Sequence, residues 1–319
     1  MRLFKMIPVT IAFLLCWAIL PLLAAQRRSS VPSVDARSCR PHESPQRRET
    51  SLLEVGEEQK LRQGQVTVDQ IRVISYNIRW RSGEDLKKLV EHFRNNPEIG
   101  NGAIMGLQEV DRNKRRSGNT NTAKLMADEL VLHYAWAAPP VVKVEDEEET
   151  GVAILSLFPL SDLQRIVLPH EGPGHRRRVA LGATVKIGDH SVRVYSIHAE
   201  TRIPLDKKLE QMNAVLEDLA HYPKSIPVIV LGDLNTWEAN AEPRTNKLFS
   251  DAGFHTPFGS QTTFSRKILF MPLELKLDWV WLRGLEFSSY GIDRKVELSD
   301  HWPLWVNLRM PIRQQQTVR

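Results

Sequence analysis

Short apolar runs recur along the chain from residue 66 onward, and they alternate with longer amphipathic stretches. Most of the runs are rich in β-branched or aromatic residues and are bounded by Gly, Pro, Asn or Asp, a pattern that predicts β-strands. The predicted strands cover residues 71–78, 103–110, 151–158, 179–187, 191–199, 226–235, 275–282 and 303–310.

Three stretches between these runs have the pattern of helices, at residues 83–96, 121–131 and 204–222. The last of them places its apolar residues at i, i+3, i+4 and i+7, which gives one apolar face: Leu205, Leu209, Met212, Val215, Leu216 and Leu219. Strands in two groups with helices between them predict an α/β fold in which two β-sheets pack face to face and helices cover them.

The first 25 residues follow a different pattern. Arg2 and Lys5 precede an uncharged stretch at residues 6–25, about the length that spans the hydrocarbon core of a bilayer. We expect an uncleaved membrane anchor in preference to a cleaved signal peptide, whose apolar region is usually shorter. In both cases the protein is exported and is either membrane-anchored or secreted or periplasmic. Basic residues flank both ends of the stretch, so its orientation stays open.

Residues 26–66 are rich in Ser, Pro, Arg and Glu and have no sustained periodicity, which predicts a flexible linker. The main domain is therefore expected at residues 67–312, followed by a short C-terminal tail at residues 313–319.

The charge of the chain says little about its substrate. The net charge is +5 over 319 residues, but residues 1–64 contain ten basic and six acidic side chains, which leaves 33 basic and 32 acidic for the rest. A main domain this close to neutral does not favour nucleic acid over other substrates. Only Cys16 and Cys39 are present, which excludes a disulfide framework and a cysteine zinc site. Any metal ion must be bound by oxygen and imidazole ligands.

Polar side chains recur at the ends of the predicted strands. They are Asn77, Glu109, His198, Asp233 with Asn235, Asp278, and Asp300 with His301. Each alone is consistent with an ordinary turn, loop or core residue. A buried carboxylate, however, must be paired, hydrogen-bonded or bound to a metal, and six strand ends carry such groups. On an extended chain Asp233 and Asn235 are expected to point to the same side.

These segments resemble the endonuclease/exonuclease/phosphatase superfamily, whose fold is DNase I-like. The resemblance covers residues 71–310 and rests on SYNI, LQEV, GVAILS, SIHAE, GDLNT, LDWVW and SDHWPL, which occur in the order of the family. It implies a four-layer α/β sandwich, with two mixed β-sheets face to face, helices outside, and a site at one edge.

The resemblance also implies residue roles in metal-assisted hydrolysis of a phosphate ester. Glu109, Asn77 and Asp300 would bind Mg²⁺, with Mn²⁺ as the alternative. His301 would act as a base or as a charged partner of the phosphate, with its ring fixed by Asp278. The remaining predicted roles are water activation by Asp233 and phosphate contacts from Asn235, His198 and Arg178.

Two departures from the family pattern bear on the substrate. The abasic-site nucleases commonly carry an acid where this chain has Arg79, and a residue other than histidine at the position of His198. This argues against an abasic endonuclease. Val152 stands where many members carry a polar Asn, so one phosphate contact is expected to be missing.

The leading hypothesis is a divalent-metal-dependent phosphodiesterase acting on nucleic acid or on a phospholipid headgroup. One alternative is a phosphomonoesterase acting on a phosphoinositide or a similar headgroup. An alternative of another class is a catalytically inactive, membrane-tethered binding module. The N-terminal segment implies contact with a membrane, no motif predicts a protein partner, and we expect a monomer.

Overall fold

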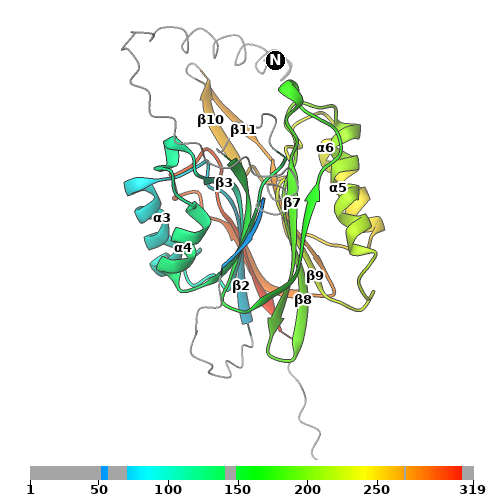
Figure 1. Ribbon diagram of the computed structural model, residues 1–319. Coiled ribbons are helices and arrows are strands. Elements are labelled where there is room, and N and C mark those ends of the chain that lie inside the picture. The colour runs from blue at the N-terminus through cyan, green and yellow to red at the C-terminus, as the bar shows by residue number, and fades with distance from the viewer. Residues whose placement is uncertain (1–51, 57–69, 141–148, 269–270, 311–319) are drawn as a thin grey trace, which may run out of the picture.

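The computed structural model describes residues 52–56, 70–140, 149–268 and 271–310. Among these residues, two β-sheets pack face to face (Figure 1). The larger sheet has the order β1 (Leu53–Val55), β4 (His133–Ala137), β5 (Glu149–Ser156), β3 (Ile104–Arg112), β2 (Gln70–Asn77), β14 (Leu304–Arg309) and β13 (Glu286–Ile292). The smaller sheet has the order β12 (Asp278–Arg283), β9 (Val228–Asp233), β8 (His190–His198), β7 (Val179–Ile187) and β6 (Leu160–Val167).

Helices cover the outer faces of both sheets. Figure 1 shows α3 (Gly83–Asn95) and α4 (Thr122–Leu130) outside the larger sheet, and α5 (Leu205–Leu219) and α6 (Ala241–Asp251) outside the smaller one. Apolar side chains fill the space between the sheets and the space under each helical layer. The expected four-layer α/β sandwich is confirmed.

Both sheets are mixed. β2 pairs with β3 in parallel, and β8 pairs with β9 in parallel, whereas the other pairs in the two sheets are antiparallel. A parallel pair needs a long crossover connection, and α3 and α5 supply one for each pair.

The register of these strands brings predicted site residues together at one edge. In β8 and β9, His198 lies opposite Asp233, and in β12 Asp278 lies opposite the same Asp233. In the larger sheet, Asn77 ends β2 beside β3, which carries Glu109.

All eight predicted strands and all three predicted helices are present. The apolar pattern did not predict β4, β6, β13 or α6, nor the separate antiparallel pair β10 (Phe264–Ile268) and β11 (Met271–Leu275). Two 3₁₀ helices, η1 (Arg115–Ser117) and η2 (Pro173–His175), lie in connections.

The prediction of a flexible linker at residues 26–66 is wrong at Leu53–Val55, which form β1. This strand pairs with β4, and the Glu54 carboxylate accepts hydrogen bonds of 2.7 Å from the Tyr134 hydroxyl and of 2.7 Å from the Asn121 amide. Because both partners lie far along the chain, the local composition gave no sign of this strand.

The predicted anchor at residues 1–25 and tail at residues 313–319 lie outside the described residues. Within the described parts of the chain, no helix is both long and apolar enough to cross a membrane.

Candidate active site

A pocket of about 660 Å³ opens at the edge where the strand ends converge. Seven of the nine predicted site residues line it: Glu109, Arg178, His198, Asp233, Asn235, Asp300 and His301. The other two, Asn77 and Asp278, are buried and contact Asp233 and His301 respectively.

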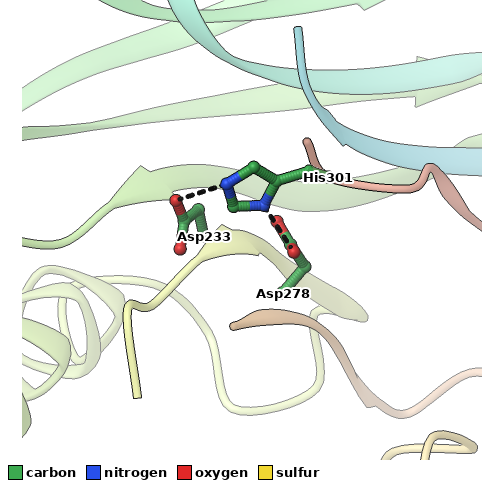
Figure 2. A group of neighbouring side chains, drawn as sticks. All are labelled: Asp233, Asp278 and His301. Carbon is green, nitrogen blue, oxygen red and sulfur yellow. Dashed lines mark hydrogen bonds and ion pairs between the residues drawn. The ribbon is translucent and has the colours of Figure 1, made fainter. Parts of the chain in front are cut away.

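The His301 imidazole lies between two carboxylates (Figure 2). Its Nδ1 is 2.8 Å from Oδ2 of Asp278, and its Nε2 is 3.7 Å from Oδ2 of Asp233. The same Oδ2 of Asp278 accepts a 2.7 Å hydrogen bond from the Thr263 hydroxyl, which itself accepts hydrogen bonds from the Asp278 and Leu277 amides. The Thr263 hydroxyl thus fixes the carboxylate oxygen that holds the imidazole.

Burial and charge act in opposite directions on this imidazole. Burial by itself would lower the pKa of His301, but the Asp278 and Asp233 carboxylates outweigh it and raise that pKa to about 10. Burial raises the pKa of Asp233 to about 7, although the His301 cation opposes the rise. At neutral pH His301 is therefore a cation facing the pocket.

His198 lies on the other side of Asp233. Its Nε2 is 3.6 Å from Oδ2 of Asp233, and its Nδ1 lies 3.3 Å from a terminal nitrogen of Arg178. Burial, then Arg178 and His301, lower the pKa of His198 well below its ordinary value. Because Arg178 can only donate, Nδ1 of the neutral ring is the acceptor and Nε2 carries the proton.

Glu109 provides the strongest indication of a cation site. It lies in a β-bulge of β3 with φ of 55°, an arrangement that redirects a side chain. Its Oε1 is 3.5 Å from the Asn77 amide nitrogen, whereas its Oε2 is buried and has no hydrogen-bond partner among the residues that the structure describes. A buried carboxylate oxygen without a partner is costly, and a hard cation would satisfy it.

A second set of donors is Asp233, Asp278 and His301, whose ligand atoms all lie within 4.8 Å of one another. Within the part of the chain that the structure describes, these three side chains form a cluster that could hold a metal ion. A protonated imidazole cannot bind a metal ion, so a cation held by this cluster would have to displace the proton of His301.

Asp300 has a partner other than a metal. Its Oδ2 lies 3.2 Å from a terminal nitrogen of Arg79, while the Arg79 backbone amide donates to the Asn77 side-chain oxygen at 3.0 Å. Arg79 and Trp80 both have positive φ, at 48° and 49°. A cation bound by Asp300 would have to compete with the Arg79 guanidinium.

The expected geometry of Asn235 is wrong. β9 ends at Asp233, and Asn235 has φ of 52°, so it does not lie on an extended chain. Its backbone amide donates to Oδ1 of Asp233 and its side-chain amide donates to the Ala199 carbonyl, both at 3.0 Å. Asn235 still lines the pocket beside Asp233, because this turn, and not strand alternation, directs it there.

Comparison with known proteins agrees with this arrangement. The model of the endonuclease/exonuclease/phosphatase family matches residues 74–301, which include the strand ends that form the pocket. The chain belongs to this family. Its members are hydrolases of phosphate esters and generally depend on a divalent metal ion.

Solved structures of the family share the fold. An endonuclease/exonuclease/phosphatase from Beutenbergia cavernae DSM 12333 is 18% identical, with 76% of this chain and 72% of that chain covered at a TM-score of 0.60. D. rerio TDP2 complexed with single-strand DNA product is 16% identical, with 76% of this chain and 100% of that chain covered at a TM-score of 0.59. The human Nocturnin catalytic domain with bound sulfate anion is 19% identical, with 75% of this chain and 94% of that chain covered at a TM-score of 0.57. No curated protein matches the chain in sequence.

The family position occupied by Val152 lies in the core. Val152 is fully buried, belongs to the cluster between the two sheets, and does not line the pocket. Its side chain therefore contributes nothing to substrate contact.

The sequence analysis did not identify three buried residues at or near the site: Glu200, Thr263 and Lys208. Glu200 lies beneath the arginines, with its Oε2 3.0 Å from Nε of Arg178 and 3.5 Å from a terminal nitrogen of Arg176. Burial would raise the pKa of Glu200, but Arg178 and Arg176 outweigh it and lower that pKa. Thr263 and Lys208 are also buried. Glu200 follows His198 by two residues in the SIHAE motif, whereas no pattern in the sequence pointed to Thr263. Lys208 lies three residues after Leu205 and four before Met212, so helical spacing places it on the apolar face of α5, where a search for apolar residues overlooks a lysine.

Proposed function

We propose that the protein is a divalent-metal-dependent phosphodiesterase and that Mg²⁺ is the ion it uses. The observation that carries this proposal is the imidazole of His301, held between Asp278 and Asp233 and close to His198 in one pocket with the unpartnered oxygen of Glu109. The pocket of about 660 Å³ around this centre has room for the two groups that a diester carries.

Glu109 and Asn77 would hold the metal ion, and Asp300 would join them if Arg79 moved away. Carboxylate and amide oxygens are the donors that Mg²⁺ accepts. When bound, the ion supplies charge stabilisation to a phosphate oxygen and orients the ester.

His301 contributes a fixed positive charge to the phosphate. Its Nδ1 proton is held by Asp278, so Nε2 is directed toward Asp233 and the pocket. An imidazolium held by a carboxylate is a preorganised donor for the negative charge that develops on the phosphoryl oxygens.

Asp233 is placed to orient and deprotonate the attacking water. Its Oδ2 already accepts from Asn77 at 3.1 Å and faces both histidines, so a water at the pocket side of Asp233 would have an acceptor and two neighbouring donors. The Nε2 proton of His198, the second amide proton of Asn235 and the Arg178 guanidinium are the remaining donors for phosphate oxygens.

We further propose that residues 6–25 tether this domain to a membrane and that it acts outside the cytoplasm. The support is the apolar length of that segment and the basic residues before it.

Hydrolysis of two chromogenic esters tests the function. The full chain in detergent is incubated with bis-p-nitrophenyl phosphate and with p-nitrophenyl phosphate, with Mg²⁺ and with EDTA. We expect Mg²⁺-dependent cleavage of the diester, and loss by about three orders of magnitude or more in Asp233→Asn and His301→Ala.

Two results would contradict the proposal. Cleavage of the monoester alone would favour the phosphomonoesterase. No cleavage by a folded protein, with the circular dichroism and unfolding temperature of a native domain, would favour a binding module.

A further inference from the structure

The β10–β11 pair has one face that is almost entirely apolar. In its register Phe264 lies opposite Leu275, Arg266 opposite Leu273 and Ile268 opposite Met271, and directly opposed residues share a face. The reverse face carries Ser265, Lys267, Pro272 and Glu274. This alternation is that of an amphipathic strand pair.

The apolar face points into the pocket and not into the core. Phe264, Arg266, Ile268, Leu273 and Leu275 line the pocket. None of the apolar ones belongs to the three hydrophobic clusters formed by the described residues. Figure 1 shows the two strands rising above one end of the sandwich.

These side chains remain partly exposed. Phe264, Ile268, Leu273 and Leu275 are of intermediate exposure, and Met271 is 66% exposed. Leaving contiguous aliphatic surface in water is unfavourable, and such surface beside a cluster of reactive groups is typical of a ligand-binding wall.

The pocket also has a cationic wall. Arg176, Arg178 and Arg202 line it, and the guanidinium groups of Arg176 and Arg178 both pair with the buried carboxylate of Glu200. The two guanidinium groups of Arg176 and Arg178 against one carboxylate leave a positive surface suited to phosphate. The pocket thus offers cationic and aliphatic surfaces around the His301 centre.

We propose that the substrate is a phospholipid whose aliphatic part lies against the β10–β11 face while its phosphate faces the arginines and His301; this rests on the phosphodiesterase function proposed above. Apart from Phe264 and Arg266, the wall is aliphatic, and the Phe264 ring meets His301 edge-on with centroids 5.0 Å apart. Binding of single-stranded nucleic acid relies instead on aromatic rings on which bases stack.

The two tryptophans that line the pocket, Trp80 and Trp237, are each partly covered by a cation. The Trp80 ring lies under the Arg116 guanidinium at 4.2 Å, and the Trp237 ring lies 5.0 Å from the Lys208 ammonium. One face of each ring is therefore already in contact with a cation.

The dependence of the rate on chain length tests the inference. Monomeric dibutanoyl and dihexanoyl forms of phosphatidylcholine, phosphatidylethanolamine and phosphatidylglycerol are compared, each below its critical micelle concentration, alongside bis-p-nitrophenyl phosphate and a single-stranded oligonucleotide. For the preferred headgroup, we expect kcat/KM to be about tenfold higher for the dihexanoyl form, because its longer chains bury more apolar surface.

Two variants separate the two faces of the strand pair. Leu273→Ser is expected to bring the ratio of dihexanoyl to dibutanoyl kcat/KM close to one. Lys267→Gln, on the reverse face, is expected to keep the wild-type ratio. If Leu273→Ser fails to fold, the ratio of dihexanoyl to dibutanoyl kcat/KM in the wild type still tests the inference: a value of about ten supports it and a value near one contradicts it.

The outcomes separate this inference from the function on which it rests. Cleavage of the chromogenic diester with a ratio near one for every headgroup would overturn the phospholipid inference and leave the phosphodiesterase standing. So would a kcat/KM for the oligonucleotide above that for every lipid, which would identify nucleic acid as the substrate. If none of the diesters is cleaved, whether chromogenic, lipid or oligonucleotide, both proposals fall.

Discussion

The ammonium group of Lys208 lies 2.7 Å from the backbone carbonyl oxygen of Asn235, although the Lys208 side chain is completely buried. The same ammonium is 2.6 Å from Oε1 of Glu238. α5 thereby fixes the turn after β9, where Asn235 has a positive φ and donates through its backbone amide to Asp233. A helix on the outer layer positions a residue of the pocket.

Lys208→Met is expected to loosen this turn and to destabilise the protein. Removing one partner of a buried ion pair leaves the other without compensation, a loss of about 3 kcal/mol in the free energy of unfolding. We expect kcat/KM for bis-p-nitrophenyl phosphate to fall by about tenfold because Asn235 is no longer held beside Asp233. Denaturant unfolding and steady-state kinetics measure the two effects.

The double variant Lys208→Met with Glu238→Gln is the matched control. Because the uncompensated charge is gone, it is expected to regain part of the stability but not the activity. Recovery of both together would show that Lys208 acts on stability alone.

Asp278→Asn tests the carboxylate that holds His301. The amide has the same shape but lacks the charge that raises the pKa of His301 to about 10, so that pKa is expected to fall. By analogy with other imidazole–carboxylate pairs, kcat is expected to drop by about 10³- to 10⁴-fold. NMR titration of the histidine signals and single-turnover kinetics provide the readouts.

Thr263→Val is the companion variant. It removes the hydroxyl that donates to Asp278 at 2.7 Å but keeps the carboxylate, so we expect a smaller loss of about tenfold. Equal losses in Asp278→Asn and Thr263→Val would show that orientation, and not charge, is what His301 needs.

Glu109→Gln tests the cation site. A ligand that binds only the folded state raises the unfolding temperature, by an amount that corresponds to about 2.7 kcal/mol at a hundredfold excess over Kd. We expect millimolar Mg²⁺ to stabilise the wild type and to have little effect on the variant. Glu286→Gln, on β13 away from the pocket, is expected to respond as the wild type does, and a full Mg²⁺ response in Glu109→Gln would place the ion elsewhere.

His198 is expected to make stability depend on pH. Its pKa in the fold is well below the ordinary value of about 6.5, so just below that pH the unfolded chain binds a proton that the folded chain does not. The contribution of His198 to stability is therefore present above pH 6.5 and is lost as the pH falls below it.

The comparison with His198→Asn isolates this contribution. In metal-free buffer, the free energy of unfolding of the wild type relative to the variant is expected to fall by up to about 1.4 kcal/mol per pH unit below pH 6.5. His221→Asn, which changes an exposed histidine, is the matched control for this comparison. A flat difference for His198→Asn would mean that the folded protein accepts the proton.

The apolar pattern predicted the strands that carry the site but not the elements that complete it. β9 is a continuous apolar run that ends at Asp233, and β12 is one that begins at Asp278, so the pattern identified both residues directly. β10 and β11 were missed because their apolar residues face a pocket, and an alternating half-exposed strand pair without a core partner gives a weak signal. β1 was missed because its stabilising partners are far along the chain.

The sequence by itself determined which chemical groups this protein has and on which strands they lie. Its motifs, in their order, were enough for the fold and for the nine candidate residues, because strand periodicity and residue type are local properties. Tertiary structure alone decided that His301 lies between Asp278 and Asp233, that Lys208 is buried against Asn235, and that Glu109 has an oxygen without a partner. These relationships join residues from separate elements, and burial, which shifts their pKa values and makes an unpaired charge costly, exists only once the layers have packed.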